Sequence, residues 1–256
     1  FFFFHEAKTE NPIIPLSIFR NHDLNGDFIL FATTWGAFIA VNTYLPMWAQ
    51  ALLGMSALMG GMTLIPNSIV EIIASQTVAT IQEKIRTFTL VMIGIVTMMI
   101  SSGGLFLANN QTPLWMLIVV GAFSGIGVGF IFVGLQVKVQ IDAGMKDMAT
   151  ATSTSYLIRI LAQTVMAAVY GVIMNLALAS GINSHSNITM KMMNELSDAK
   201  SAKLLPQYLL PEMRRIFHSG IHEIMAVSFI LLIIATVFNF YFNFRQPNKK
   251  LNRSSK

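Results

Sequence analysis

Long charge-free stretches of mostly apolar residues alternate with short polar breaks along most of the chain. Two uninterrupted runs cover 28–70 and 87–137, and each is about twice the length that a helix needs to cross a hydrocarbon layer of roughly 30 Å. Turn-forming residues divide each run, at 54–56 and at 109–113. Two later stretches add one helix each. The pattern predicts six spans, at about 28–52, 57–81, 87–108, 113–137, 148–178 and 222–244.

The composition supports a protein embedded in a lipid bilayer. Hydrophobic residues make up 54% of the chain and charged residues 11%, against roughly 25% charged in soluble domains. Too few charges are present to coat a water-facing surface. The absence of cysteine excludes disulfides, thiolate metal sites and a cysteine nucleophile. We therefore predict an all-α membrane protein.

The positions of lysine and arginine predict its orientation. The connections after spans two and four carry Lys84 and Arg86, then Lys138 and Lys146, whereas those after spans one and three carry no charge. Basic loops remain on the cytoplasmic side. We expect a multi-pass plasma-membrane protein with both ends cytoplasmic and an external loop at about 179–221. The net charge of +5 is then a topology signal and does not indicate nucleic-acid binding.

The spans differ in character. Spans one, two, four and five carry polar, aromatic or small residues at three- and four-residue spacing, which places them on one helix face, whereas spans three and six are almost purely aliphatic and aromatic. Two spans with such a stripe followed by one without it occur twice along the chain. This order indicates an inverted three-plus-three repeat, the unit of many secondary transporters. Alternatively, the striped helices simply pack in the centre of a bundle. The residues expected to line a substrate cavity are Trp35, Asn42, Asn67, Gln136, Tyr156, Gln163 and Tyr170.

Two charges fall deep within predicted spans. Glu71 and Arg159 each lie 11 residues from the cytoplasmic end of their span, roughly 16 Å at about 1.5 Å per residue. An arginine at such depth is costly unless it is paired or hydrated. We expect the two to form a charge pair in which Glu71 binds a proton or a cationic substrate. The alternative is a salt bridge that only fixes two helices together.

Small residues and prolines predict contacts and bends within the spans. Gly121, Gly125 and Gly129 form a small-residue stripe that permits close helix packing. Pro46 and Pro66 each remove a backbone hydrogen bond and imply kinks, which are either gating hinges or ordinary bends.

Several segments resemble a known family. They are 12–21 (PIIPLSIFRN), 44–50 (YLPMWAQ), the glycine-rich fourth span, 156–163 (YLIRILAQ), and Glu83 and Lys84 in a cytoplasmic loop. These are similar to the C-terminal half of the fourteen-span EmrB/QacA-type drug:proton antiporters of the major facilitator superfamily. The sequence departs from that pattern at Arg86, Leu161 and Ala162, where the family usually has glycine.

The resemblance implies proton-coupled export of drugs or other amphiphiles by alternating access, driven by the proton gradient and without a cofactor. It also implies a partner, the N-terminal half of the same polypeptide. Residues 1–27 then comprise the end of a preceding helix and a cytoplasmic linker, 28–244 form the six-span half, and 245–256 form a basic cytoplasmic tail.

Other functions stay open. The substrate is alternatively an amino acid, a peptide or a lipid-like metabolite: a cationic substrate predicts that Glu71 faces the cavity, and an anionic one makes Arg159 the anchor. A half-transporter that pairs with another chain is a further alternative. An intramembrane enzyme has one weak candidate site, at His218, His222 and Glu223, which lies near a helix start and lacks a further ligand. We therefore expect no enzymatic activity.

Overall fold

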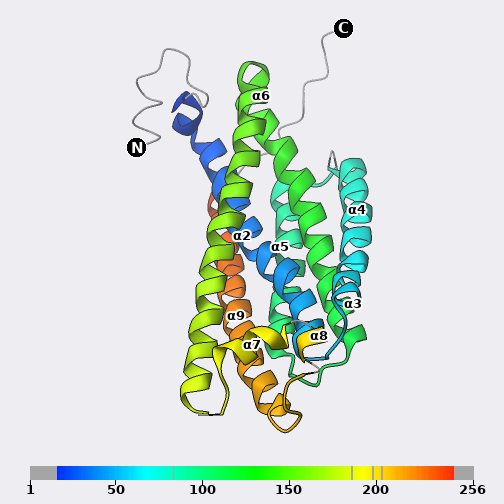
Figure 1. The fold of residues 1–256 in the computed structure, drawn as a ribbon. Helices are drawn as coiled ribbons and strands as arrows, with labels where there is room; N and C mark the ends of the chain where they lie inside the picture. Colours follow the sequence, from blue (N-terminus) through cyan, green and yellow to red (C-terminus); the bar gives the residue numbers. More distant parts are fainter. Residues whose placement is uncertain (1–15, 83, 186, 198, 203, 245–256) are drawn as a thin grey trace.

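The computed structural model describes residues 16–82, 84–185, 187–197, 199–202 and 204–244, and within these ranges all regular structure is helical. Long helices run side by side along the molecule (Figure 1). The elements are the 3₁₀ turn η1 (Leu16–Arg20), α2 (His22–Ala51), α3 (Ala57–Met62), α4 (Leu64–Ile81), α5 (Thr87–Leu107), α6 (Leu114–Asn183), α7 (Met190–Leu196), α8 (Ala199–Ala202) and α9 (Leu210–Asn243).

Five helical segments in the described part of the chain are long and apolar enough to cross a membrane. One of them, α6, has 70 residues and would measure about 105 Å if straight, far more than a bilayer core. It bends at Gly144, whose φ of 70° and ψ of 171° are not helical. Its first arm (114–143) and second arm (145–183) run back alongside each other (Figure 1). Each predicted span therefore corresponds to helix.

Several helices extend beyond the predicted spans. The first begins at His22, where the Asn21 side chain accepts a hydrogen bond from the N–H of Asp23 at 3.0 Å. The last begins at Leu210, 12 residues before the predicted 222, and α6 continues through Lys138. Absence of charge marks only the part of a helix that faces lipid, so it underestimates helix length.

The connection between α6 and α9 is shorter than the predicted external loop and contains helix. The second arm of α6 continues to Asn183, and α7 and α8 occupy part of the connection to α9. Met193 and Leu196 of α7 are buried and belong to the same apolar cluster as residues of α2, α6 and α9.

The second predicted span is discontinuous. Its first piece, α3, ends at Met62 and its second, α4, begins at Leu64. Pro66 has no N–H to donate to the carbonyl of Met62, and its ring crowds that carbonyl, which explains a break at this position. Pro46, in contrast, lies within the continuous helix α2.

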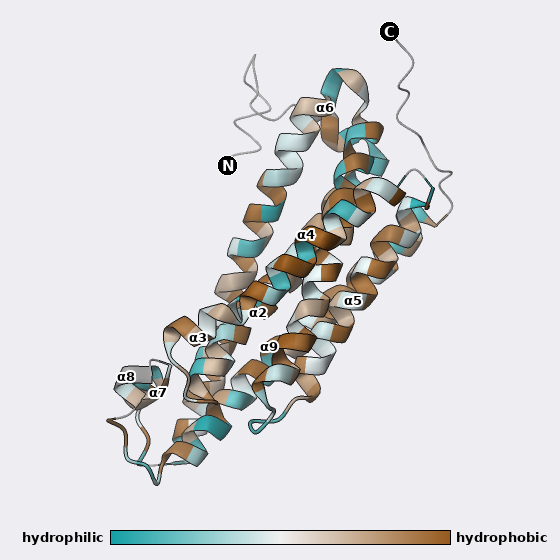
Figure 2. Cartoon of the chain, turned by 90° about the vertical axis from the view of Figure 1, so that its right-hand side faces the viewer, coloured by the Kyte–Doolittle hydropathy of each residue, from teal (hydrophilic) through white to brown (hydrophobic). Residues whose placement is uncertain are grey.

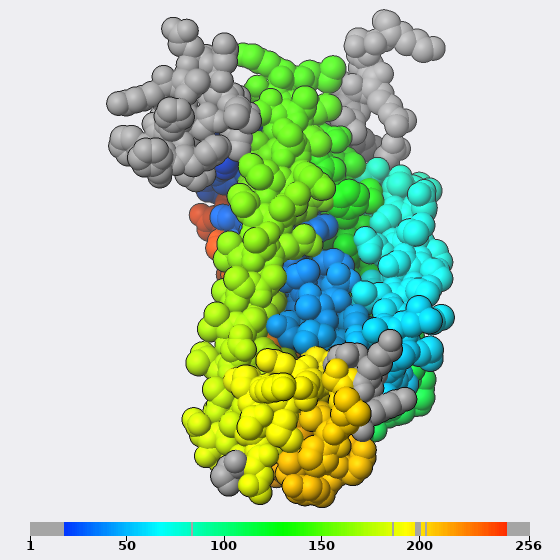
Figure 3. Space-filling model, viewed as in Figure 1, coloured from blue at the N-terminus to red at the C-terminus, as the bar shows by residue number. Residues whose placement is uncertain are grey.

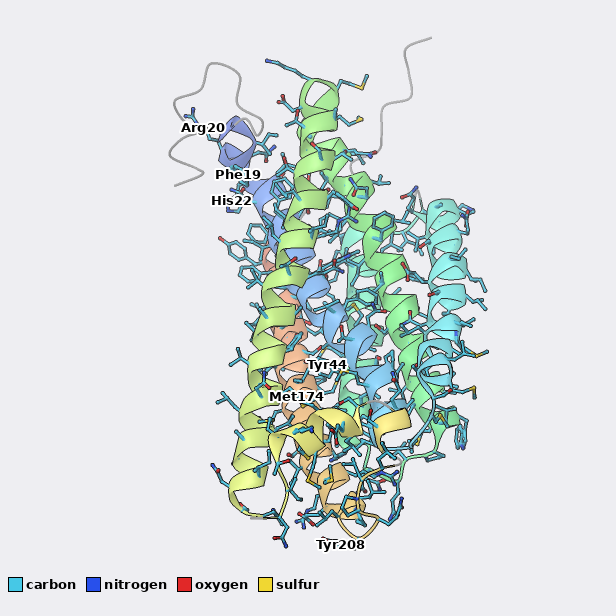
Figure 4. All side chains as sticks on the ribbon, in the orientation of Figure 1. Phe19, Arg20, His22, Tyr44, Met174 and Tyr208 are labelled. Carbon is cyan, nitrogen blue, oxygen red and sulfur yellow. The ribbon has the colours of Figure 1, made fainter. Side chains whose placement is uncertain are left out.

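The core follows α2, which contributes to both buried apolar clusters of the described residues. One cluster surrounds Trp48 and Phe217, and the other surrounds Phe31 and Ile131. Tyr44 of α2 and Met174 of α6 lie near each other in the middle of the bundle (Figure 4). Residues of α5, α6 and α9 also belong to both clusters, so these four helices share the core.

Outward-facing surfaces remain strongly apolar. Apolar residues are prominent along α4 and α5 (Figure 2). Ile72, Val165 and Val237 are 63%, 60% and 63% exposed. Such surfaces are unfavourable in water and suit contact with lipid.

Glycines in the first arm of α6 allow two neighbouring helices to approach closely. A Cβ added to Gly125 would clash with the backbone carbonyl of Asn67, and one added to Gly129 would lie 2.7 Å from the carbonyl oxygen of Glu71. A Cβ on Gly121 would lie 2.6 Å from Leu45 of α2. The glycine stripe therefore fits against α4 and α2 without space for side chains.

We expect Gly125→Ala to lower the free energy of unfolding by about 1 to 3 kcal/mol, because the new methyl group meets rigid backbone. Gly171→Ala is the matched control, since no atom lies within 4 Å of a Cβ at this helical position. Thermal unfolding in detergent measures both. Equal melting temperatures for the two variants would contradict the close contact.

Candidate functional site

Arg159, in the second arm of α6, is held in a cage of aromatic rings. Its side chain is nearly buried, with 6% exposure for the residue. The guanidinium carbon lies between 4.8 and 5.3 Å from four ring centroids, those of Phe31, Trp35, Phe132 and Tyr156. Rings at this distance attract a cation through their quadrupole, by about 0.5 to 2 kcal/mol each.

Gln136 is a polar neighbour of the caged guanidinium group. Arg159 Nη2 donates to Gln136 Oε1 at 3.4 Å, and the Ser155 hydroxyl donates to the same oxygen at 3.4 Å. Arg159 Nε and Gln136 Nε2 are buried and have no hydrogen-bond partner. Two buried N–H donors are therefore left without acceptors, a costly arrangement.

Four of the residues predicted to serve one site come together here: Trp35, Gln136, Tyr156 and Arg159. They come from α2 and from both arms of α6. Phe31 and Phe132 complete the cage. Phe132 shares a helical stripe with Gln136 in the sequence, whereas nothing in the sequence distinguishes Phe31 from the many other phenylalanines.

Glu71 does not pair with Arg159. No ion pair between described residues joins them. Glu71 is half-buried on α4, where its backbone carbonyl lies against Gly129 of α6. The expected charge pair is thus absent from this conformation, because the rings and Gln136 occupy the surroundings of the guanidinium group.

The other predicted cavity residues have varied environments. Tyr170 is fully buried, and its hydroxyl donates to the carbonyl of Gly36 at 2.9 Å, so it links α6 to α2. Asn67 is 3% exposed and packs against Gly125, while Asn42 and Gln163 are half-buried. Lys84 is exposed in the turn after α4, and Glu83 lies outside the described residues.

A buried ion cluster that the sequence did not reveal lies near one end of the bundle. Lys138 Nζ is 2.7 Å from Asp27 Oδ1 and 2.6 Å from Asp142 Oδ2, and all three side chains are at most 7% exposed. Asn21 donates from its side chain to the carbonyl of Asp142 at 3.0 Å. The cluster joins the start of α2 to the first arm of α6.

This cluster corrects the interpretation of Lys138 as a loop residue. Lys138 lies inside α6, four residues before Asp142, so the two face the same side of the helix. The four-residue spacing of opposite charges is a signal that was present in the sequence. Nothing in the sequence, however, indicates that Asp27, 111 positions away, is the second partner.

His218 and His222, from the weak candidate enzyme site, contact residues near the end of α5. His218 Nε2 lies 2.9 Å from the carbonyl oxygen of Ala108, and the His222 ring stacks on Phe106 with centroids 3.9 Å apart. Within the described ranges, no group of three or more histidine or acidic side chains is placed to hold a metal ion.

The model of one protein family, the Major Facilitator Superfamily, matches residues 5–182, well over half of the chain. The chain belongs to the major facilitator superfamily. This membership agrees with the helical architecture and the apolar outer surfaces. The fourteen-span drug:proton antiporter subgroup is the part of this superfamily that the sequence resembles.

Similar proteins have transporter names. Multidrug resistance protein 3 of Bacillus subtilis (strain 168) is 26% identical over 251 residues, covering 92% of this chain and 48% of that protein. Multidrug transporter protein MdtP of the same organism is 26% identical over 174 residues, covering 66% of this chain and 31% of that protein. The Aspyridones efflux protein of Neocamarosporium betae is 23% identical over 231 residues, covering 89% and 41%.

This major facilitator chain thus spans about half the length, or less, of these relatives. Family membership and the relatives' names point to a transporter and not to an enzyme. Arg159 and Glu71 both lie within segments long and apolar enough to span a membrane.

We expect Lys138→Met to lower the free energy of unfolding by about 3 to 5 kcal/mol, because it leaves two buried carboxylates close together without a cation. Lys191→Met, which removes an exposed lysine from a weak pair with Glu195, is the control and is expected to change little. Thermal unfolding in detergent measures both.

Replacing the whole cluster, with Asp27→Leu, Lys138→Met and Asp142→Leu together, is expected to restore much of the stability lost in Lys138→Met. A single variant as stable as the Lys191→Met control would show that the cluster is hydrated and contributes little.

Proposed function

We propose that this chain supplies one half of a proton-coupled secondary transporter that exports drugs or other amphiphilic compounds by alternating access. Support comes from the family match and from relatives named as multidrug or efflux proteins. The structural observation that carries the proposal is the caged Arg159, because a buried charge within a spanning segment is retained at a cost and usually serves a substrate or ion pathway.

The arrangement of helices supports a six-span half. With α3 and α4 counted as one broken span and the two arms of α6 counted separately, six segments cross the bundle, and they divide into two sets of three. We propose that these sets form an inverted repeat. The broken second span is a separate feature that suits a transporter, since transporter sites commonly include discontinuous helices.

We propose a plasma-membrane location with the α6 turn facing the cytoplasm. Arg20, the turn between α4 and α5, and the turn at Gly144 lie at one end of the bundle (Figures 1 and 4). Arg86 donates to the carbonyl of Phe244 at 2.9 Å, so the end of α9 lies there too. Clustered basic residues at one end agree with a cytoplasmic side.

The face that carries the cage suits a cavity shared with further transmembrane helices. It is hollowed between α4 and the second arm of α6, with α2 behind them (Figure 3). Tyr156 and Phe132 reach the surface, with 60% and 39% exposure. We propose that the N-terminal half of the same polypeptide covers this face, and that amphiphilic substrates bind between the halves. Family members use ion gradients and need no cofactor.

Glu71 is the proposed proton-binding residue. It is half-buried in a spanning helix, and no described side chain forms an ion pair with it. A carboxylate in this setting can gain or lose a proton without breaking an existing salt bridge. Its position on α4 is fixed by close contact of the backbone with Gly129.

We expect Glu71→Gln to abolish proton-driven transport while leaving membrane insertion intact, because glutamine keeps the shape and removes the titratable group. Uptake of the fluorescent aromatic anion 8-anilinonaphthalene-1-sulfonate into inverted vesicles, energised by a proton gradient, measures it in the full-length protein. Glu223→Gln, which removes an exposed acid from α9, is the control. Unchanged gradient-driven uptake in Glu71→Gln would refute the coupling role.

A further inference from the structure

The Arg159 cage lacks a counter-ion. Four aromatic rings and one amide oxygen surround the guanidinium group, and no carboxylate of the described residues pairs with it. Lys138, in contrast, is buried with two carboxylates. The chain therefore compensates one of its buried cations fully and leaves the other with a net positive charge.

The unsatisfied atoms at the cage are all donors. Arg159 Nε and Gln136 Nε2 are both buried, both carry N–H groups, and neither has an acceptor. Both belong to side chains already joined by the Arg159–Gln136 hydrogen bond. A ligand that satisfies them must provide acceptor oxygens, and the positive charge favours oxygens that carry negative charge.

The aromatic rings of the cage determine which chemical group the ligand can carry next to its negatively charged group. Phe132 and Tyr156 are partly exposed, so they offer ring surfaces beside the charged group. Trp35 and Phe31 lie deeper, at 9% and 0% exposure. Aromatic faces and edges bind a flat apolar ring well, whereas Arg159 repels a cation at the place where an aromatic cage would otherwise bind one.

We propose that the Arg159 cage is a binding site for aromatic anions, in which Arg159 and Gln136 bind a carboxylate while Phe132 and Tyr156 pack against the attached ring. The site rests on the proposed transport function and assigns it a substrate class, amphiphilic organic anions. A phospholipid headgroup carries the same kind of anionic oxygen, so the experiment must distinguish the two sources.

Three ligands of matched shape test the charge preference. They are 2-naphthoate, the neutral 2-naphthamide and the cationic 2-naphthyltrimethylammonium ion, each titrated by calorimetry into the full-length protein in an uncharged detergent. We expect naphthoate to bind at least about tenfold more tightly than the amide, because its oxygens accept charge-assisted hydrogen bonds. The cation is expected to bind most weakly.

Substitutions in the cage test whether Arg159 and Gln136 cause the preference for the anionic ligand. Arg159→Gln is expected to bind naphthoate and naphthamide equally, and Arg159→Lys to keep part of the preference, because it retains the charge but loses the planar donor group. Gln136→Leu, which removes the second donor, is expected to weaken naphthoate binding alone. Lys191→Gln removes an exposed positive charge that is not part of the cage, and it serves as the control. If Arg159→Gln does not fold, Arg159→Lys and Gln136→Leu decide the matter.

Equal binding of naphthoate and naphthamide by the unmodified protein would overturn the proposal, as would a preference that persists in Arg159→Gln. Displacement of naphthoate by phosphatidylglycerol, with no displacement by excess neutral lipid, would assign the site to lipid headgroups and also overturn it. Ligand binding can be measured without a proton gradient. If the protein prefers the anion but shows no gradient-driven export, only the proposed transport function is rejected. If it exports substrate but shows no charge preference, only the anion site is rejected.

Discussion

The close approach of α4 and α2 to the glycine stripe of α6 is the contact on which the rest of this structure depends. Within lipid, apolar helices gain little from burying apolar surface against one another, so association relies on close packing and polar contacts. Gly121, Gly125 and Gly129 provide such packing, because backbone meets backbone or a Leu45 methyl group. Continuing along the same helix, Phe132 and Gln136 belong to the cage. The packing surface and the candidate binding surface are thus parts of one helix.

Two buried cations in this bundle are stabilised in different ways. Lys138 has two carboxylates and gives α2 and α6 an ionic contact near one end. Arg159 has aromatic rings, which lower the cost of burial but leave its charge uncompensated. The difference supports the proposed anion site, since a compensated charge holds helices together, whereas an uncompensated one retains its affinity for a mobile anion.

In the proposed half-transporter, the ion cluster, the Arg159 cage and Glu71 have separate roles. The ion cluster lies toward the end that carries Arg20 and the α6 turn (Figures 1 and 4), and the caged arginine lies between α2 and the two arms of α6. Glu71 lies on a separate helix and forms no ion pair with another described residue. In the proposed mechanism the charge of the substrate binds at Arg159 on α6, and the proton binds at Glu71 on α4. Relative movement of α4 and α6 can then couple the binding of substrate to the binding of the proton.

The sequence by itself determined the class of protein, the positions of the spanning helices and most of the cage. Apolar length reflects the thickness of a bilayer, and residues at three- and four-residue spacing share a helix face, so Arg159 and Tyr156 were recognisable together. Only the tertiary structure decided which helices meet. It placed Asp27 beside Lys138 and surrounded Arg159 with rings instead of Glu71, because contacts between distant helices depend on rotation, tilt and bends such as that at Gly144. Helical periodicity fixes a residue's face, but the direction in which that face points is a property of the assembled bundle.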